Sequence, residues 1–72
     1  MNTDERAKIR TLLGYWIAHN KEHSQEFRER ADKVRMSGEA EAAEEILLAA
    51  QEMDKASEIL SRALSRLEEK EG

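Results

Sequence analysis

The sequence has no cysteine and no proline, and its 72 residues include only three glycines. Without cysteine there is neither a disulfide framework nor a thiolate metal site. The longest purely apolar run, residues 46–50, is far shorter than the roughly 20 residues that span a bilayer. We therefore expect no membrane association. A chain this short buries a thin core, and association with a second copy is the simplest additional support.

The net charge of −4 disfavours a nucleic-acid partner, because phosphate contacts need clustered Lys and Arg side chains. Residues 1–36 carry eight basic and six acidic side chains, whereas residues 37–72 carry four and ten. The two halves therefore have opposite charge, which favours their packing on each other. The first residues are polar and acidic, unlike a signal peptide, and we expect a cytoplasmic protein.

Helix-forming residues dominate, and charged residues make up 39% of the chain. The pattern predicts a single domain over residues 1–72, with one helix over about 4–36, a turn at about 37–38 and a second helix over about 39–70. Gly38 suits the left-handed backbone position that follows a helix. The expected fold class is all-α.

Two features near the start of the chain bear on the first helix. Thr3 is a good N-cap, because its hydroxyl can accept a hydrogen bond from a free backbone amide of the first turn. Gly14 lies inside the helix and costs about 1 kcal/mol relative to Ala. A break at Gly14, which would give three shorter helices, is the structural alternative.

Apolar residues repeat in alternating steps of three and four, which is the heptad pattern of a helix packed on another helix. The first helix follows this pattern through Ile9, Leu13, Trp16 and Phe27, with the polar residues Asn20 and His23 at two intervening positions, and reaches Val34 one heptad later. The second follows it through Ala43, Ile46, Ala50, Met53, Ser57, Leu60, Leu64 and Leu67. Beside the second series an alanine recurs every seven residues, at Ala42, Ala49, Ala56 and Ala63. This line favours close helix packing, although Ala is also simply the best helix former.

The short turn makes the two helices an antiparallel hairpin with coiled-coil character. Folding about the turn places Ile9 near Leu67 and Trp16, the expected large core anchor, near Leu60. A single hairpin leaves part of its apolar surface uncovered, so we expect two copies to form a homodimeric four-helix bundle. The residues predicted for its core and interface are Ile9, Leu13, Trp16, Asn20, Phe27, Ile46, Ala49, Met53, Ala56, Leu60 and Leu64.

His19 and His23 are four residues apart and share one helix face, within reach of a single metal ion. Candidate carboxylate ligands are Glu22 and Glu26 nearby and Asp54, which the hairpin places at a similar height. Two imidazoles with one or two carboxylates suit a divalent ion such as Zn²⁺, Ni²⁺ or Co²⁺. The alternative is that His23 is a hydrogen-bonded core residue. No catalytic motif accompanies the pair, so we expect no enzyme.

The stretch 12–27 resembles a family of small prokaryotic helical domains of unassigned function. Their pattern is Leu-Leu-x-His-Trp-Ile-x-His-Asn-x-x-His, followed by Phe four residues later, and the stretch 51–56 looks like the family's second helix. The resemblance carries over Trp16, His19, Asn20 and His23 as the motif positions. Tyr15 departs from the pattern, which has a third His there. Three His at this spacing would resemble a metal or cofactor site, and the Tyr either weakens such a site or acts in it as a weaker ligand or hydrogen-bond partner.

These observations lead to two functional hypotheses. The first is a non-enzymatic self-association or interaction module without a cofactor. Its partner would be a second copy of the chain, in a homodimer, or another protein. Asn20 and His23 would fix its register, and a His there could make assembly sensitive to pH. The second is a divalent-metal-binding helical protein that uses His19 and His23.

Overall fold

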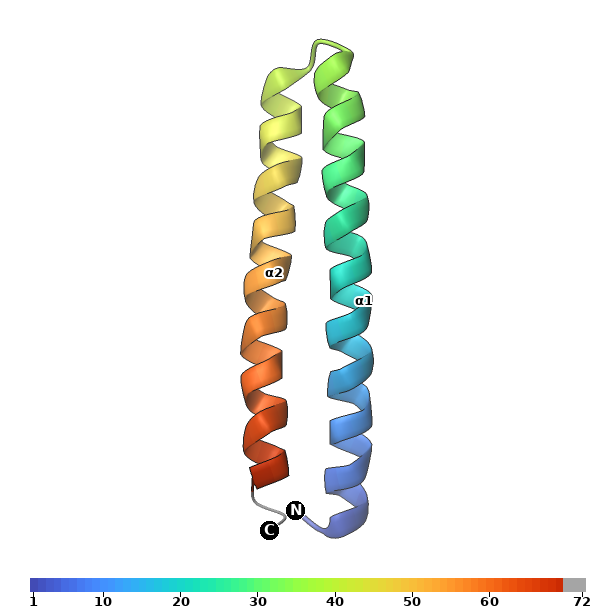
Figure 1. The fold of residues 1–72 in the computed structure, drawn as a ribbon, viewed down its shortest axis with the longest axis vertical. Coiled ribbons are helices and arrows are strands. Elements are labelled where there is room, and N and C mark those ends of the chain that lie inside the picture. Colours follow the sequence, from blue (N-terminus) through green and yellow to red (C-terminus); the bar gives the residue numbers. More distant parts are fainter. Residues whose placement is uncertain (70–72) are drawn as a thin grey trace.

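The computed structural model describes residues 1–69, and the chain forms one antiparallel helical hairpin (Figure 1). Helix α1 spans Thr3–Met36, and helix α2 spans Ala40–Glu69. The described residues contain no strand, so the predicted all-α hairpin is confirmed. The expected end of the second helix, near residue 70, lies outside the described residues.

Asn2, rather than Thr3, caps the start of α1. The Asn2 side-chain oxygen accepts a hydrogen bond from the backbone N–H of Glu5 at 2.8 Å. Asn2 has an extended backbone, while Thr3 is already the first helical residue. Both residue types make good caps, and the prediction of Thr3 was wrong by one position. Asp4 and Glu5 lie in the first turn, where acidic side chains complement the helix dipole.

The turn after α1 closes through a Schellman motif. Gly38 has the left-handed φ of 91° expected from the sequence. The Gly38 N–H donates to the Arg35 carbonyl at 3.0 Å, and the Glu39 N–H donates to the Val34 carbonyl at 3.2 Å. These bonds satisfy carbonyls that the end of α1 would otherwise leave unpaired, and they reverse the chain within three residues.

Helix α1 runs through Gly14 without a break, so the three-helix alternative is excluded. A Cβ built on Gly14 meets nothing within 4 Å, because the residue faces solvent. Neither the backbone conformation nor a close neighbour within the hairpin requires a glycine at this position.

The centre of α2 follows the predicted heptad pattern. Ala43, Ala50 and Ser57, spaced seven residues apart, are its buried residues. The larger side chains of the predicted series lie beside them and are half-buried: Ile46, Met53, Leu60, Leu64 and Leu67. The small central residues let α1 approach closely, because no bulky group holds the helices apart.

The centre of α1 departs from the predicted series after Leu13. Its buried residues are Leu13, Ser24 and Ala31, whereas Trp16 is 43% exposed and His23 is half-buried. The expectation that Trp16 anchors the core of the hairpin was therefore wrong. At the small residues of α2 the helices approach closely, with the Ser24 hydroxyl 3.4 Å from the Ala50 carbonyl, so Ser24 and Ala31 take the central positions and Trp16 lies on the flank.

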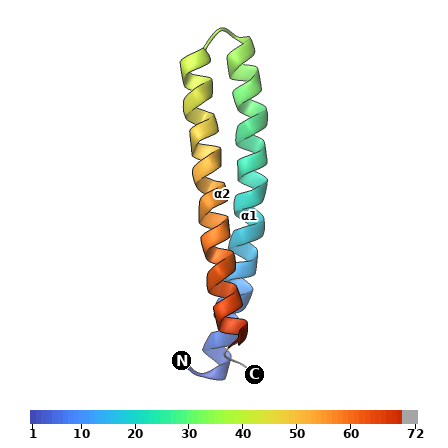
Figure 2. The same cartoon turned by 60° about the vertical axis from the view of Figure 1, so that its left-hand side comes forward.

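Contacts along the hairpin define its register. At the open end, the Arg6 guanidinium donates to the Leu67 carbonyl at 3.3 Å, and near the turn Arg35 pairs with Glu44 at 3.4 Å. Figure 2 shows the helices side by side near the turn and overlapping towards the termini, so they wind around each other. The resulting rod measures 53 × 14 × 14 Å.

Candidate functional site

The two histidines belong to a row of four rings on α1, which we call the histidine row: Tyr15, His19, His23 and Phe27. Tyr15 stacks on His19 with ring centroids 5.4 Å apart and planes inclined by 14°. The His19 and His23 rings meet edge to face at 4.4 Å and 89°, and the Phe27 ring lies 6.2 Å from His23. Because the four residues are spaced four apart, they are neighbours on one helix face, as predicted for the histidines.

The Nε2 atoms of His19 and His23 are 3.0 Å apart. At that distance one ring can donate an N–H to the lone pair of the other, which requires that at least one Nε2 is unprotonated. Imidazole nitrogens are also common ligands of divalent metal ions. Two Zn²⁺ ligands at 2.0–2.1 Å in tetrahedral geometry lie about 3.3 Å apart, a separation close to that of the two Nε2 atoms.

Asp54 does not join the histidines. Its carboxylate accepts a hydrogen bond from the Ser24 hydroxyl at 2.6 Å and pairs with the Arg28 guanidinium at 2.5 Å. The Ser24 hydrogen bond and, next, the one from Arg28 lower the pKa of Asp54 below its ordinary value. The carboxylate is therefore ionised and joins the middle of α2 to α1.

The predicted metal ligands consequently do not form one cluster within a chain. Among residues 1–69, no three His, Asp or Glu side chains lie close enough to hold a metal ion. Glu22 and Glu26 are exposed on α1 and complete no such group around the histidines. The described part of each chain thus supplies two imidazole nitrogens that converge, and no further ligand beside them.

Two buried serines, Ser24 and Ser57, are polar residues that the sequence analysis did not predict to be part of a site. Ser24 is 4% exposed, and its hydroxyl lies 2.6 Å from the Asp54 carboxylate and 3.4 Å from the Ala50 carbonyl. Ser57 is 5% exposed, and its hydroxyl has no hydrogen-bond partner within the described part of the chain. The available signal was heptad spacing: Ser24 precedes Ala31, and Ser57 follows Ala50, by seven residues.

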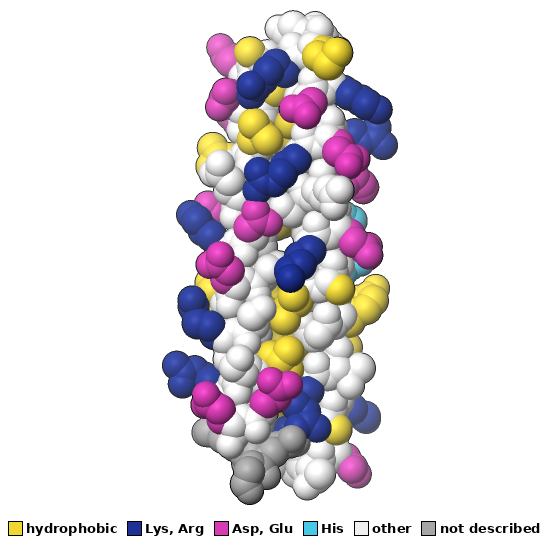
Figure 3. Space-filling model, in the orientation of Figure 1, with side chains coloured by type: hydrophobic (Ala, Val, Ile, Leu, Met, Phe, Trp, Pro, Cys, Tyr) yellow, Lys and Arg dark blue, Asp and Glu magenta, His cyan; other side chains and the backbone are white. Residues whose placement is uncertain are grey.

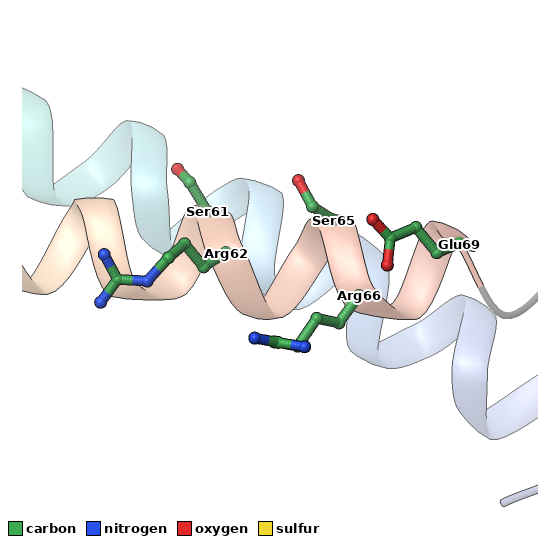
Figure 4. Close-up of a pocket in the computed structure, with 5 residues that line it drawn as sticks. All are labelled: Ser61, Arg62, Ser65, Arg66 and Glu69. Atoms are coloured by element: carbon green, nitrogen blue, oxygen red, sulfur yellow. The ribbon is translucent and has the colours of Figure 1, made fainter.

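One side of the hairpin is polar. Its depression is lined by Lys21, Asp54, Ser57, Glu58, Ser61 and Arg62. Figure 3 shows Lys, Arg, Asp and Glu side chains spread over one face, with hydrophobic side chains among them along the middle, and His side chains only at the right-hand edge. Another hollow, drawn in Figure 4, is formed by side chains of α2 alone, with Ser61 and Ser65 on one side and Arg62 and Arg66 on the other. A hollow formed by one helix alone is an open surface groove and does not enclose a ligand.

The other flank, which we call the apolar side, has two depressions between the helices. Near the turn, Phe27 of the histidine row lies with Ile46 and Ala49, and Arg30 and Glu45 stand beside them. Near the termini, Ile9, Leu13, Ala63 and Leu67 form the second depression, beside Arg66 and Glu69. The predicted pairing of Ile9 with Leu67 is confirmed. Heptad spacing from the residues that line the depressions puts the half-buried Asn20, Met53 and Leu60 and the exposed Ala56 in the stretch between them.

A family model described as a domain of unknown function, DUF8180, matches residues 9–67. The chain belongs to the DUF8180 family. The match covers the histidine row, the Asp54 contacts and both depressions of the apolar side, so the DUF8180 domain is essentially the whole hairpin. It agrees with the resemblance to domains of unassigned function, while the histidine motif itself stays a prediction.

No curated protein matches the DUF8180 domain, and no solved structure matches it. Neither α1 nor α2, within residues 1–69, has the length of apolar sequence that a membrane crossing needs. The geometry of the side chains is therefore the basis for proposing what the DUF8180 domain does.

Proposed function

We propose that this domain is a non-enzymatic self-association module, in which two hairpins pair through their apolar sides to form a homodimeric four-helix bundle. The observation that carries the proposal is the surface that one hairpin leaves exposed. The chain exposes 5553 Å², whereas a compact monomer of 8.3 kDa exposes about 4,600 Å². The excess of about 1,000 Å² is comparable to the roughly 800 Å² that each partner buries in a standard interface.

The shape of the chain supports the same conclusion. Its radius of gyration is 16.3 Å, whereas a compact domain of this length has about 11 Å. Four hydrophobic residues among those described are buried, and three of them are alanines: Leu13, Ala31, Ala43 and Ala50. Burial of large apolar side chains is the main favourable term in folding, and most of these side chains stay partly exposed in one hairpin.

Charge on the apolar side is compatible with a second copy of the same chain. Each depression has one basic and one acidic residue beside it, Arg30 with Glu45 and Arg66 with Glu69. A surface of balanced charge does not repel its own copy, and twofold symmetry requires such self-complementarity. The charged side chains around the depression of the polar side, Lys21, Asp54, Glu58 and Arg62, suit it to be the solvent-facing surface of the bundle.

The proposal is tested with two alanines that are both exposed in the hairpin. Ala56 lies seven residues from both Ala49 and Ala63, which line the two depressions, so Ala56→Glu places a carboxylate in the proposed interface. Ala18 is the matched control, because it lies one turn before Lys21 of the polar side. Both substitutions have the same intrinsic helix cost.

Sedimentation equilibrium should give a mass of two chains for the parent and for Ala18→Glu, and of one chain for Ala56→Glu at micromolar concentration. Circular dichroism should show helix in all three. A parent protein with the mass of one chain, or an Ala56→Glu variant that dimerises as tightly as the parent, would overturn the proposal. In the first case, a different protein would be the partner.

A second candidate function is divalent-metal binding. The observation that favours it is the 3.0 Å separation of the His19 and His23 Nε2 atoms.

A further inference from the structure

The histidine pair presents two converging imidazole nitrogens on α1 of each chain. Its two Nε2 atoms converge to 3.0 Å, and aromatic contacts from Tyr15 and Phe27 flank the two rings. A structural Zn²⁺ site has four ligands. Since the described residues of one chain supply no third ligand around the pair, a closed site needs donors from elsewhere.

The position of the pair along the rod indicates where those donors come from. His19 lies 16 residues after the first residue of α1, and His23 lies 13 residues before the last. The pair therefore sits near the middle of the helix. If two hairpins pair along their full length, a twofold axis brings middle against middle, whether the axis runs along the rod or across it. The histidine pairs of two copies then lie at the same height.

The pair also lies next to the proposed interface. His23 neighbours Phe27, and Phe27 lines the depression formed with Ile46 and Ala49 on the apolar side. Trp16, seven residues before His23 and seven after Ile9, continues the same flank towards the second depression. Pairing through the apolar side consequently brings His23, and His19 one turn away, towards the partner chain.

We propose that His19 and His23 of two copies together bind one divalent transition-metal ion at the centre of the dimer. Four neutral imidazole nitrogens form a tetrahedral donor set that suits Zn²⁺, with Co²⁺ as its spectroscopic substitute. The ion connects the two chains at mid-height, and each histidine pair opens slightly from its present contact to accept it. This inference rests on the proposed self-association.

The test is a titration of the chelator-treated full chain with Co²⁺ and with Zn²⁺, with molar mass measured in the same samples. We expect one ion per two chains, a visible absorption band typical of tetrahedral Co²⁺, and displacement of Co²⁺ by Zn²⁺. His19→Gln and His23→Gln should each abolish the band while helicity is kept, since the first side chain is exposed and the second half-buried. Glu22→Gln, between them, is the matched control and should bind as the parent does.

The outcomes separate this inference from the proposal on which it rests. A mass of two chains in chelator with no uptake of metal would overturn the metal site and leave self-association standing. One ion per chain, or loss of the band in Glu22→Gln, would overturn the four-histidine site in favour of a site within one chain. A mass of one chain with and without metal would overturn both.

Discussion

Replacing Trp16 tests whether this side chain lies on the exposed flank of a single hairpin or is buried in the interface of a dimer. The side chain is 43% exposed in the hairpin, and a Trp side chain can bury up to about 250 Å². Burying the remainder, about 100 Å² at about 25 cal/mol per Å², stabilises a dimer by about 2.5 kcal/mol per chain. Since two chains contribute, Trp16→Ala should weaken dimerisation by about 5 kcal/mol, or about 4,000-fold in dissociation constant.

The assay uses the fact that Trp16 is the only tryptophan. Its fluorescence should shift to shorter wavelength as protein concentration rises through the dissociation constant, in parallel with the mass from sedimentation. Leu48→Ala is the control, because Leu48 is 56% exposed and one heptad before Lys55 on the outer surface of α2. The reasoning is refuted if Trp16→Ala dimerises like Leu48→Ala, or if the emission of the parent stays that of a solvated indole in the dimer.

Three further predictions concern the hairpin itself. Gly14→Ala should raise the free energy of unfolding by about 1 kcal/mol, because the added methyl meets nothing and glycine is the poorer helix former; a lower midpoint in urea would contradict this. The pKa of Asp54 is lowered in the folded chain, so folding gains stability above the ordinary value of 3.8 and loses it as the pH falls through and below that value. Asp54→Asn should therefore flatten the dependence of the urea midpoint on pH between about 2 and 5, and an unchanged slope would refute the assignment. Ser57→Ala should leave stability unchanged or raise it, because the buried hydroxyl has no partner among the described residues, whereas Ser24→Ala should lower it by about 1 kcal/mol through loss of the bond to Asp54; equal thermal midpoints for the two variants would contradict this.

The sequence was sufficient to predict the hairpin fold. It was insufficient to predict which residues of α1 are buried against α2. Gly38 and the heptad series of α2 predicted the turn and the buried face, because each had one consistent pattern. On α1, Trp16 and Ile17 both continue the steps of three and four from Leu13. Hydrophobicity favoured Trp16 as the buried residue. The distance between the helices, however, depends on the small residues of α2, and the pattern of α1 alone carries no information about them.

The position of Asp54 at the candidate site was likewise predicted only in part from the sequence. Its height along the rod was predicted correctly from the antiparallel fold, so it does lie near the middle of α1. A residue on the flank of a helix can face either side of a hairpin, however, and height does not distinguish them. Asp54 contacts Ser24 and Arg28 and lies with Lys21 on the polar side, while His23 faces Phe27 and the apolar side.

The Schellman turn at Gly38 has a consequence for the order in which the hairpin opens. Pairs across the helices are separated by ever more sequence with distance from the turn, from 9 residues between Arg35 and Glu44 to 61 between Arg6 and Leu67. Contacts near the turn close short loops and re-form fastest, whereas the open end closes the longest loop and frays first. The Asp54 contacts lie midway, so amide exchange should be fast on the terminal side of Ser24 and slow between Ser24 and the turn.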